Sequence, residues 1–349
     1  MHGRDVNERR SIPAFLMFAT AGMPSWGSAA PFQASTHPMG VQAAHIYDLW
    51  NVMLGVCTVV FIAVLIGLVV ALRRAGRGDE TTPADISSFT DPEHVLERNV
   101  MISVGISIAL LLALLAASVF TDRALARMPL DDALRLTITA HQFWWEVRYE
   151  DEPSSRIFTT ANELQIPVGR PVLARLQASD VIHSFWVPNL QGKKDLIPGE
   201  STTIQFRADQ PGVYRGQCAE FCGYQHAWMA FQVTARPAAE FEQWAQAQRQ
   251  PAPEPTDELA RHGRDVFMAG PCAMCHNIQG TDAHGQFAPD LTHVASRPFL
   301  AAGRLPNTPS QMMAWIINPQ QFKPGVNMPA IPLSPEDLKA VVAYLQTLK

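Results

Sequence analysis

The stretch Cys218-Ala219-Glu220-Phe221-Cys222-Gly223-Tyr224-Gln225-His226-Ala227-Trp228-Met229 contains two thiols, an imidazole and a thioether within a dozen residues. Those are the ligand types that copper prefers. A second imidazole has to come from elsewhere, and His183 in Asp-Val-Ile-His-Ser-Phe-Trp is the candidate. The alternative is a local disulfide between the two cysteines with the histidine on the surface, but a disulfide explains neither the methionine nor His183. The sequence therefore predicts a copper site held by a short loop.

The segments around this loop favour β-strands. Between about Leu134 and Val233 they are short, rich in Thr, Ile, Val, Phe and Trp, and several alternate between apolar and polar residues, as in 134–139, 171–176 and 202–206. Pro and Gly pairs separate them. This pattern is typical of a small antiparallel β-sandwich. We assign residues 129–236 to it.

Two apolar runs precede the sandwich, about Ile46 to Leu72 and about Val100 to Phe120. Each has the roughly 20 residues that a helix needs to cross a bilayer, so residues 31–128 are predicted to form a transmembrane hairpin. Two buried helices of a soluble domain are the alternative, but neither run has a polar face to show to water.

The charges that flank the two runs predict their orientation. Four arginines lie between the runs: Arg73, Arg74, Arg77 and Arg98. Because basic loops stay on the cytoplasmic side, everything after Phe120 is expected outside, which in a bacterium is the periplasm.

The first 30 residues are typical of a secretory signal peptide. Three arginines, a short apolar core and small residues at Ser28-Ala29-Ala30 follow one another. Cleavage after Ala19-Thr20-Ala21 is an alternative, because Pro31 is an awkward residue to follow a cut.

A third unit follows a predicted linker at 237–256, which contains the stiff spacer Pro251-Ala252-Pro253-Glu254-Pro255. In this unit, 257–349, Cys272-Ala273-Met274-Cys275-His276 is the attachment pattern of a c-type haem. A zinc half-site is the alternative, but Met328 follows about fifty residues later and offers a distal sulfur. Met312 and Met313 are rival sulfurs on a helical pattern, where Met is more often a core residue.

Composition agrees with a membrane-anchored, several-domain protein. The 349 residues are 47% hydrophobic and 17% charged, and the net charge of -5 offers no basic surface for a nucleic acid. Four of the five cysteines come as close pairs, which favours metal or haem chemistry over a disulfide framework.

The pattern Cys-x-Glu-x-Cys-Gly-x-x-His-x-x-Met, preceded by Asp-x-x-His-Ser-Phe, resembles subunit II of cytochrome c oxidase, and the sandwich is similar to its cupredoxin domain. The resemblance implies a dinuclear copper-A centre. Cys218 and Cys222 would bridge both coppers, and His183 with Met229 would complete one of them. The second copper would take the imidazole of His226 and the backbone carbonyl of Glu220.

The same resemblance implies three further roles. The Glu220 carboxylate would share a magnesium ion with subunit I. Glu97 would lie at the mouth of a proton channel on the inner side, with snorkelling into the headgroups as the alternative. Phe143, in His-Gln-Phe-Trp-Trp, stands where the family usually has the Trp that accepts electrons from soluble cytochrome c. The resemblance therefore supplies no accepting Trp here.

The last third is similar to class I cytochromes c, with Ala288-Pro289-Asp290-Leu291 in the place of Gly-Pro-x-Leu. The Pro289 carbonyl would orient His276, and covalent haem c would be held by Cys272, Cys275, His276 and Met328. The predicted fold class is thus a transmembrane α-helical hairpin, an all-β cupredoxin sandwich and an all-α class I cytochrome c.

The order of these units is similar to subunit II of oxidases that carry their own cytochrome. The resemblance implies that the chain takes electrons from cytochrome c or an upstream quinol-oxidising complex and passes them from haem c to copper-A. Haem a of subunit I would receive them, with subunit III as a further partner, and oxygen would be reduced there to water with proton translocation. A free-standing electron carrier or a copper-delivery protein is the alternative. The first would not need Glu97 in a hairpin, and the second would not need a haem.

Overall fold

The computed structural model describes residues 33–75, 81, 83, 94–150 and 153–349. The predicted signal peptide, residues 1–30, and Arg77 lie outside the described residues.

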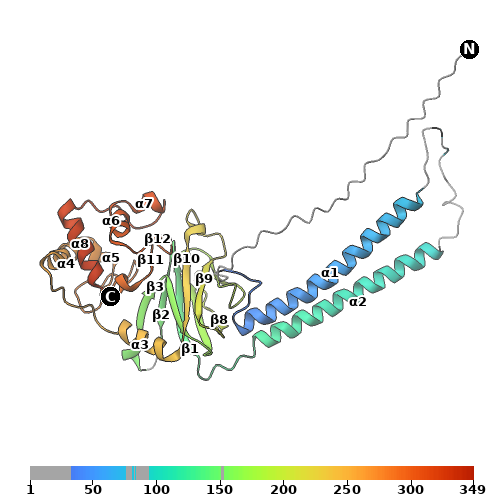
Figure 1. Ribbon diagram of the computed structural model, residues 1–349, viewed down its shortest axis with the longest axis horizontal. Helices are drawn as coiled ribbons and strands as arrows, with labels where there is room; N and C mark the ends of the chain where they lie inside the picture. Colours follow the sequence, from blue (N-terminus) through green and yellow to red (C-terminus); the bar gives the residue numbers. More distant parts are fainter. Residues whose placement is uncertain (1–32, 76–80, 82, 84–93, 151–152) are drawn as a thin grey trace, which may run out of the picture. The chain divides into compact units, whose positions relative to one another are not determined.

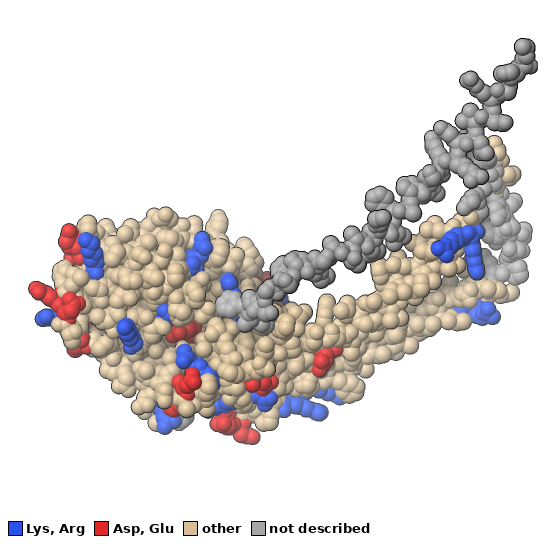
Figure 2. Space-filling view, viewed as in Figure 1, with Lys and Arg blue, Asp and Glu red and all other residues tan. Residues whose placement is uncertain are grey.

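Two long helices, α1 (Val41–Arg74) and α2 (His94–Leu125), run side by side (Figure 1). Each contains an 18-residue stretch that is apolar enough to cross a membrane, with mean hydropathies of 3.0 and 2.7. None of these stretches is buried, and in Figure 2 the visible face in the middle of the helices is free of Lys, Arg, Asp and Glu. Lipid rather than protein is the environment in which such surfaces are stable. The predicted transmembrane hairpin is confirmed.

The sandwich has two five-stranded sheets. The first has the order β3-β2-β1-β5-β8, with β1 (Leu134–His141), β2 (Trp144–Tyr149), β3 (Phe158–Ala161), β5 (Val172–Ala178) and β8 (Thr202–Phe206). The second has the order β4-β10-β9-β6-β7, with β4 (Glu163–Pro167), β6 (His183–Trp186), β7 (Lys194–Leu196), β9 (Gly212–Cys218) and β10 (Ala230–Arg236).

The prediction of an antiparallel sandwich is wrong for one strand pair in each sheet. Strand β1 pairs with β5 in parallel, and β4 pairs with β10 in parallel. Parallel neighbours need a long connection between them, and here other strands of the sandwich lie in that connection. Alternation within each strand predicts which face is buried, but it carries no information on the direction of a neighbour that is far away in the sequence.

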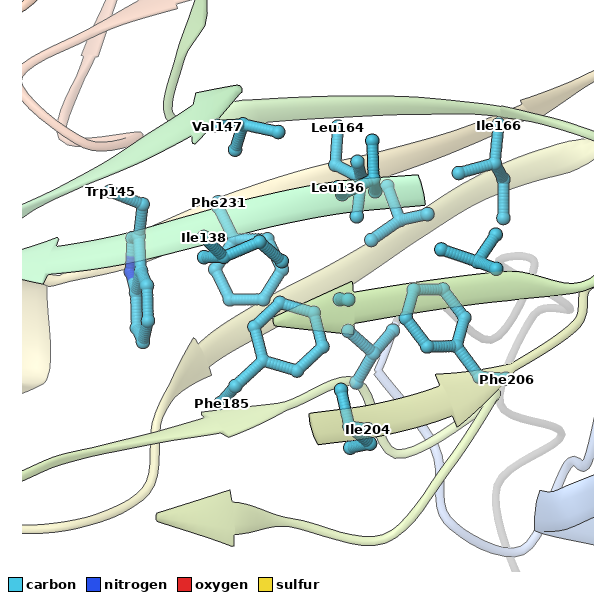
Figure 3. Packing of buried hydrophobic residues seen from close by; sticks show 14 of the residues in the cluster. Leu136, Ile138, Trp145, Val147, Leu164, Ile166, Phe185, Ile204, Phe206 and Phe231 are labelled. Atoms are coloured by element: carbon cyan, nitrogen blue, oxygen red, sulfur yellow. The ribbon is translucent and has the colours of Figure 1, made fainter. Parts of the chain in front are cut away.

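Aromatic and branched side chains from both sheets meet in one core (Figure 3). Burial alternates along β1 and β9, as expected when one face of a sheet packs on another. Trp145 is 1% exposed and contacts Phe185 and Phe231 edge to face. These rings fill the end of the sandwich that lies next to the predicted copper ligands.

Helix α3 (Ala238–Gln248) lies within the predicted linker and packs on the sandwich. Its Phe241 and Ala245 are part of the sandwich core, and Trp244 contacts the stacked rings of Tyr149 and Phe158. The proline-rich residues 251–255 that follow form neither helix nor strand.

The C-terminal unit is helical, apart from the two-residue strands β11 (Phe299–Leu300) and β12 (Leu305–Pro306). Its helices are α4 (Glu258–Ala269), α5 (Cys272–Cys275), α6 (Pro309–Ile317), α7 (Pro319–Phe322) and α8 (Pro335–Thr347). The last helix starts where its sequence favours a helix start: the Ser334 side chain accepts a hydrogen bond from Asp337 N, and Pro335 is the first helical residue.

Helices α4 and α8 cross in contact at Gly263. A Cβ atom at this position would lie 1.9 Å from the carbonyl oxygen of Ala340, so only glycine fits. Phe267, Val341 and Leu345 pack in the core beside the crossing.

Candidate copper and haem sites

The predicted copper ligands come from the ends of neighbouring strands. β6 begins at His183, β9 ends at Cys218, and the two strands pair through Phe185 and Cys218. The loop after β9 contains Cys222, and the short 3-10 helix η3 (His226–Trp228) leads into Met229 just before β10. His183, Cys218, Cys222 and Met229 are each 3% exposed or less. The ends of two adjacent strands and one loop thus hold all of these donors in the protein interior.

The sulfur and nitrogen atoms of this group lie close together. Donor atoms of His183, Cys218 and Cys222 all lie within 4.8 Å of one another. The Cys218 Sγ atom is 3.8 Å from His183 Nδ1 and 3.1 Å from the carbonyl oxygen of Glu220.

The second thiol has its own neighbours. Cys222 Sγ is 3.7 Å from His226 Nδ1 and 3.9 Å from Met229 Sδ. Both cysteines are free, so the alternative of a local disulfide is not present in the structure. The structure brings together all six residues that the sequence analysis selected for copper.

Proton sharing links the two thiols. A hydrogen bond from Cys222 lowers the pKa of Cys218 to about 3, and the same contact together with burial raises the pKa of Cys222. The contact therefore favours a thiolate at Cys218 and a protonated thiol at Cys222. Because metals bind thiolates, a metal that takes both sulfurs has to displace that proton.

Asp180 orients His183, a role that the sequence did not reveal. Its Oδ1 atom lies 2.8 Å from His183 Nε2, which leaves Nδ1 facing Cys218. Burial lowers the pKa of His183, but the hydrogen bonds to Asp180 and Cys218 outweigh it and raise the pKa overall. Asp180 also accepts hydrogen bonds from Val181 N and Gln142 N. A carboxylate that fixes the ring of a metal-binding histidine is a common device of metal sites.

Two further side chains support the loop. Gln142 Nε2 donates to the carbonyl oxygen of Cys222 at 2.6 Å. The indole N–H of Trp145 donates to the Met229 carbonyl oxygen at 3.3 Å. Both residues belong to the His-Gln-Phe-Trp-Trp segment, which the sequence analysis considered only for electron acceptance. Phe143 of that segment is buried, with 5% exposed.

Glu97, the residue considered for a proton channel, is exposed in the first turn of α2.

The predicted haem-binding residues lie around helix α5. Cys272 and Cys275 are its first and last residues, and His276 follows directly. His276 Nδ1 lies 2.7 Å from the carbonyl oxygen of Pro289, the partner that the resemblance implied. Burial lowers the pKa of His276, which favours the neutral imidazole that binds iron. The other ring nitrogen of His276, Nε2, is then the atom that would bind the haem iron.

The three candidate distal methionines have different environments. Met312 is 2% exposed in the helical core, and its sulfur lies 3.7 Å from Gln346 Nε2. Met313 is partly buried against the same core. Met328 follows α7 on a loop and is partly buried at the core edge, as is Cys272. The choice of Met328 as the distal ligand stays a prediction.

The residues present fit both groups chemically. The first site offers two thiols, two imidazoles, a thioether and a carbonyl oxygen, the soft and borderline donors that suit copper. The second offers two thiols with a histidine oriented by a carbonyl, as covalent haem requires.

Comparison with known families agrees with this division. Residues 150–236 match the family model "Cytochrome C oxidase subunit II, periplasmic domain", and residues 260–349 match "Cytochrome c". Fold and site together define a class, the membrane-anchored cupredoxin with a C-terminal cytochrome c domain.

Curated relatives give the family. The chain is 35% identical over 317 residues to cytochrome c oxidase subunit 2 of Alkalihalophilus pseudofirmus, covering 89% of this chain and 90% of the relative. It is 30% identical over 359 residues to the subunit 2 of Bacillus subtilis, covering 96% of this chain and 97% of the relative. The chain belongs to the cytochrome c oxidase subunit II family.

A solved structure of one domain is also similar. The periplasmic domain of cytochrome oxidase subunit II from Bradyrhizobium japonicum is 28% identical, with 33% of this chain and 93% of that chain covered and a TM-score of 0.31. The family assignment rests on the sequence relatives. Membership implies copper A, the other oxidase subunits as partners and a role in respiratory electron transfer, and the match of residues 260–349 to cytochrome c implies haem c.

Proposed function

We propose that this chain takes electrons into a bacterial haem-copper oxidase through its cytochrome c domain and passes them through its copper domain to haem a of subunit I. The single observation that supports this most strongly is the presence of two complete donor sets on one chain. When bound, dinuclear copper A and haem c supply one-electron redox chemistry. Oxygen reduction and proton translocation would take place in the partner subunits.

The proposed copper ligands are His183, Cys218, the Glu220 carbonyl, Cys222, His226 and Met229. Their burial in a sheet-and-loop framework supports this role, because a rigid set of ligands needs little rearrangement when the charge of the site changes. The hydrogen bond from His183 to Asp180 keeps the imidazole in one tautomer, so its Nδ1 stays available to the metal.

The proposed haem ligands are Cys272, Cys275, His276 and Met328. The hydrogen bond between His276 Nδ1 and the Pro289 carbonyl fixes the ring orientation and increases electron donation from Nε2. A methionine as the distal ligand would raise the reduction potential.

The proposal also gives the chain an orientation in the membrane and a set of partners. Arg73 and Arg74 in the last turn of α1 support a cytoplasmic loop, with the copper and haem domains in the periplasm beside the inner membrane. We further propose that the Glu220 carboxylate shares a magnesium ion with subunit I and that exposed Glu97 serves a proton channel. The donor would be cytochrome c or a quinol-oxidising complex.

Replacing one bridging thiol tests the copper assignment. In the purified oxidase, Cys218→Ser should remove the near-infrared absorption of mixed-valence copper and leave the haem c spectrum intact, because the two donor sets lie on different units of the chain. The matched control is Cys57→Ser, which changes an exposed thiol of α1 and should change neither spectrum. A near-infrared band that survives in Cys218→Ser would show that copper is bound elsewhere.

A further inference from the structure

A segment of the haem domain lies directly on the copper loop. We call residues 319–326, which comprise α7 and the following turn, the docking segment. Gln225 of the copper loop donates from its Nε2 to the Pro324 carbonyl oxygen at 2.8 Å. Gly325 has a φ of 87°, and a Cβ there would lie 3.6 Å from the Tyr224 ring. The docking segment thus contacts Gln225, which lies between the proposed ligands Cys222 and His226, whereas the neighbouring Tyr224 is 93% exposed.

Lys323 of the docking segment is the unusual residue of this contact. It is 2% exposed, and its Nζ donates to the carbonyl oxygens of Phe143 at 2.9 Å and Ala301 at 3.2 Å. The first acceptor belongs to the copper domain and the second to the haem domain. Burial lowers the pKa of Lys323 to about 7, and a lysine has at least two N–H donors in either protonation state.

A second contact joins the haem domain to the end of the copper loop, at Trp228 and Ala230. Ala301, Ala302 and Gly303 all have positive φ angles, of 52°, 57° and 83°, and this turn reaches the copper domain. The Ala302 carbonyl accepts from Ala230 N at 3.3 Å, and Arg304 lies over the Trp228 ring at 4.1 Å. Because Lys323 binds Ala301, it joins this turn to the docking segment.

The docking segment is also tied to Met328. Gln320 donates from Nε2 to the carbonyl oxygens of Val326 and Met328, and its Oε1 accepts from Gly325 N. One continuous set of hydrogen bonds therefore runs from the backbone of Met328 to Lys323 and on to the copper domain.

We infer that Lys323 is a positioning residue for electron transfer between the two domains, and that the electron crosses where Pro324 accepts the hydrogen bond from Gln225. This inference rests on the proposed function. With both groups bound, one electron would pass from ferrous haem c, held by Cys272, Cys275 and His276, to the oxidised copper pair, and the haem iron would become ferric. No proton or leaving group moves. Because tunnelling slows steeply as the gap between two centres widens, holding this contact closed sets the rate.

The burial of the Lys323 amine favours a role in orienting the docking segment over a role in strengthening the domain contact alone. Taking such a group out of water is unfavourable, and apolar residues of similar volume often stabilise a contact as well. What Lys323 adds is direction, since its two hydrogen bonds fix the docking segment relative to one carbonyl of each domain.

The test is Lys323→Met in the complete oxidase, with Lys339→Met as the control at an exposed site of α8. Flash-induced electron transfer from haem c to copper should be slower by about tenfold or more in Lys323→Met and unchanged in the control. Hydrogen exchange of the amides at 223–226 and 301–304 should be faster in Lys323→Met only. This second measurement does not depend on electron flow.

Each possible result either supports or contradicts the positioning role of Lys323. An unchanged transfer rate, or a slower rate with unchanged hydrogen exchange at both segments, overturns the positioning role. If the unaltered oxidase shows no transfer from haem c to copper, the proposed function fails first. Should Lys323→Met not assemble, Arg304→Ala removes only the exposed contact with Trp228, and it should speed exchange at 301–304 and slow transfer by a smaller factor. No change in either quantity overturns the inference.

Discussion

The glycine at the crossing of α4 and α8 gives a prediction with a magnitude. In Gly263→Ala the new Cβ would lie 1.9 Å from the Ala340 oxygen, 2.3 Å from its carbonyl carbon and 2.8 Å from Val341 N. Non-bonded atoms need roughly 3.5 Å, so the helices have to separate by about 1.5 Å. All three neighbours are backbone atoms of a helix and cannot turn away as a side chain could.

The free-energy change follows from this separation. Overpacking costs about 1–3 kcal/mol, and a gap of about 1 Å already loses a quarter to a half of the dispersion energy of a contact. The better helix propensity of alanine returns less than about 1 kcal/mol. We expect the haem domain to lose about 3 kcal/mol of stability. For a domain of 60–100 residues this lowers the melting temperature by about 12–24 °C.

Circular dichroism in the Soret region reports the unfolding of the haem domain within the intact protein. The matched control is Gly105→Ala in α2, where an added Cβ meets nothing within 4 Å, and this control should melt like the unaltered protein. A loss below about 0.5 kcal/mol in Gly263→Ala would refute the argument, because it would mean that the crossing tolerates a methyl group.

Three other changes to the chain also have expected results. Met328→Ala should keep covalent haem but lower its potential and abolish the sulfur-to-iron charge-transfer band, measured by redox titration and absorption; a persisting band would assign the ligand to Met312 or Met313. Deleting residues 256–349 should leave a folded copper domain, because its buried core ends at Ala245. Flash-induced copper reduction should be independent of dilution in the intact oxidase, as expected for a tethered donor, and should depend on added cytochrome c in the truncated one. Phe143→Trp should partly improve the truncated form, and equal, dilution-independent rates in both forms would show that the fused haem is not the donor.

The sequence was sufficient for the features that depend on local spacing. The hairpin follows from two uninterrupted apolar runs, and the donors at 218–229 lie on one loop. The start of α8 follows from Ser334 and Pro335, which act on neighbouring backbone groups. In each case the deciding interaction joins residues that are close together along the chain.

Features that depend on distant contacts could not be predicted. The parallel pairing of β1 with β5 is one, and the contact between Lys323 and Phe143 is another, since 180 positions separate those two residues. Lysine in a short polar segment ordinarily indicates a solvated surface. Only the fold shows that the Lys323 amine donates a hydrogen bond to one backbone carbonyl oxygen of each domain. The partner of His183 is a partial exception, because Asp180 is only three positions away but nothing in the pattern assigned it that role.

The burial of the copper donors restricts the order in which the protein can mature. Cys218, His183 and Met229 are no more than 1% exposed, so ions can be inserted only while the loop is open. The hydrogen bond from Gln225 to the Pro324 carbonyl ties that loop to the haem domain. We therefore expect copper to enter before the haem domain packs on the loop.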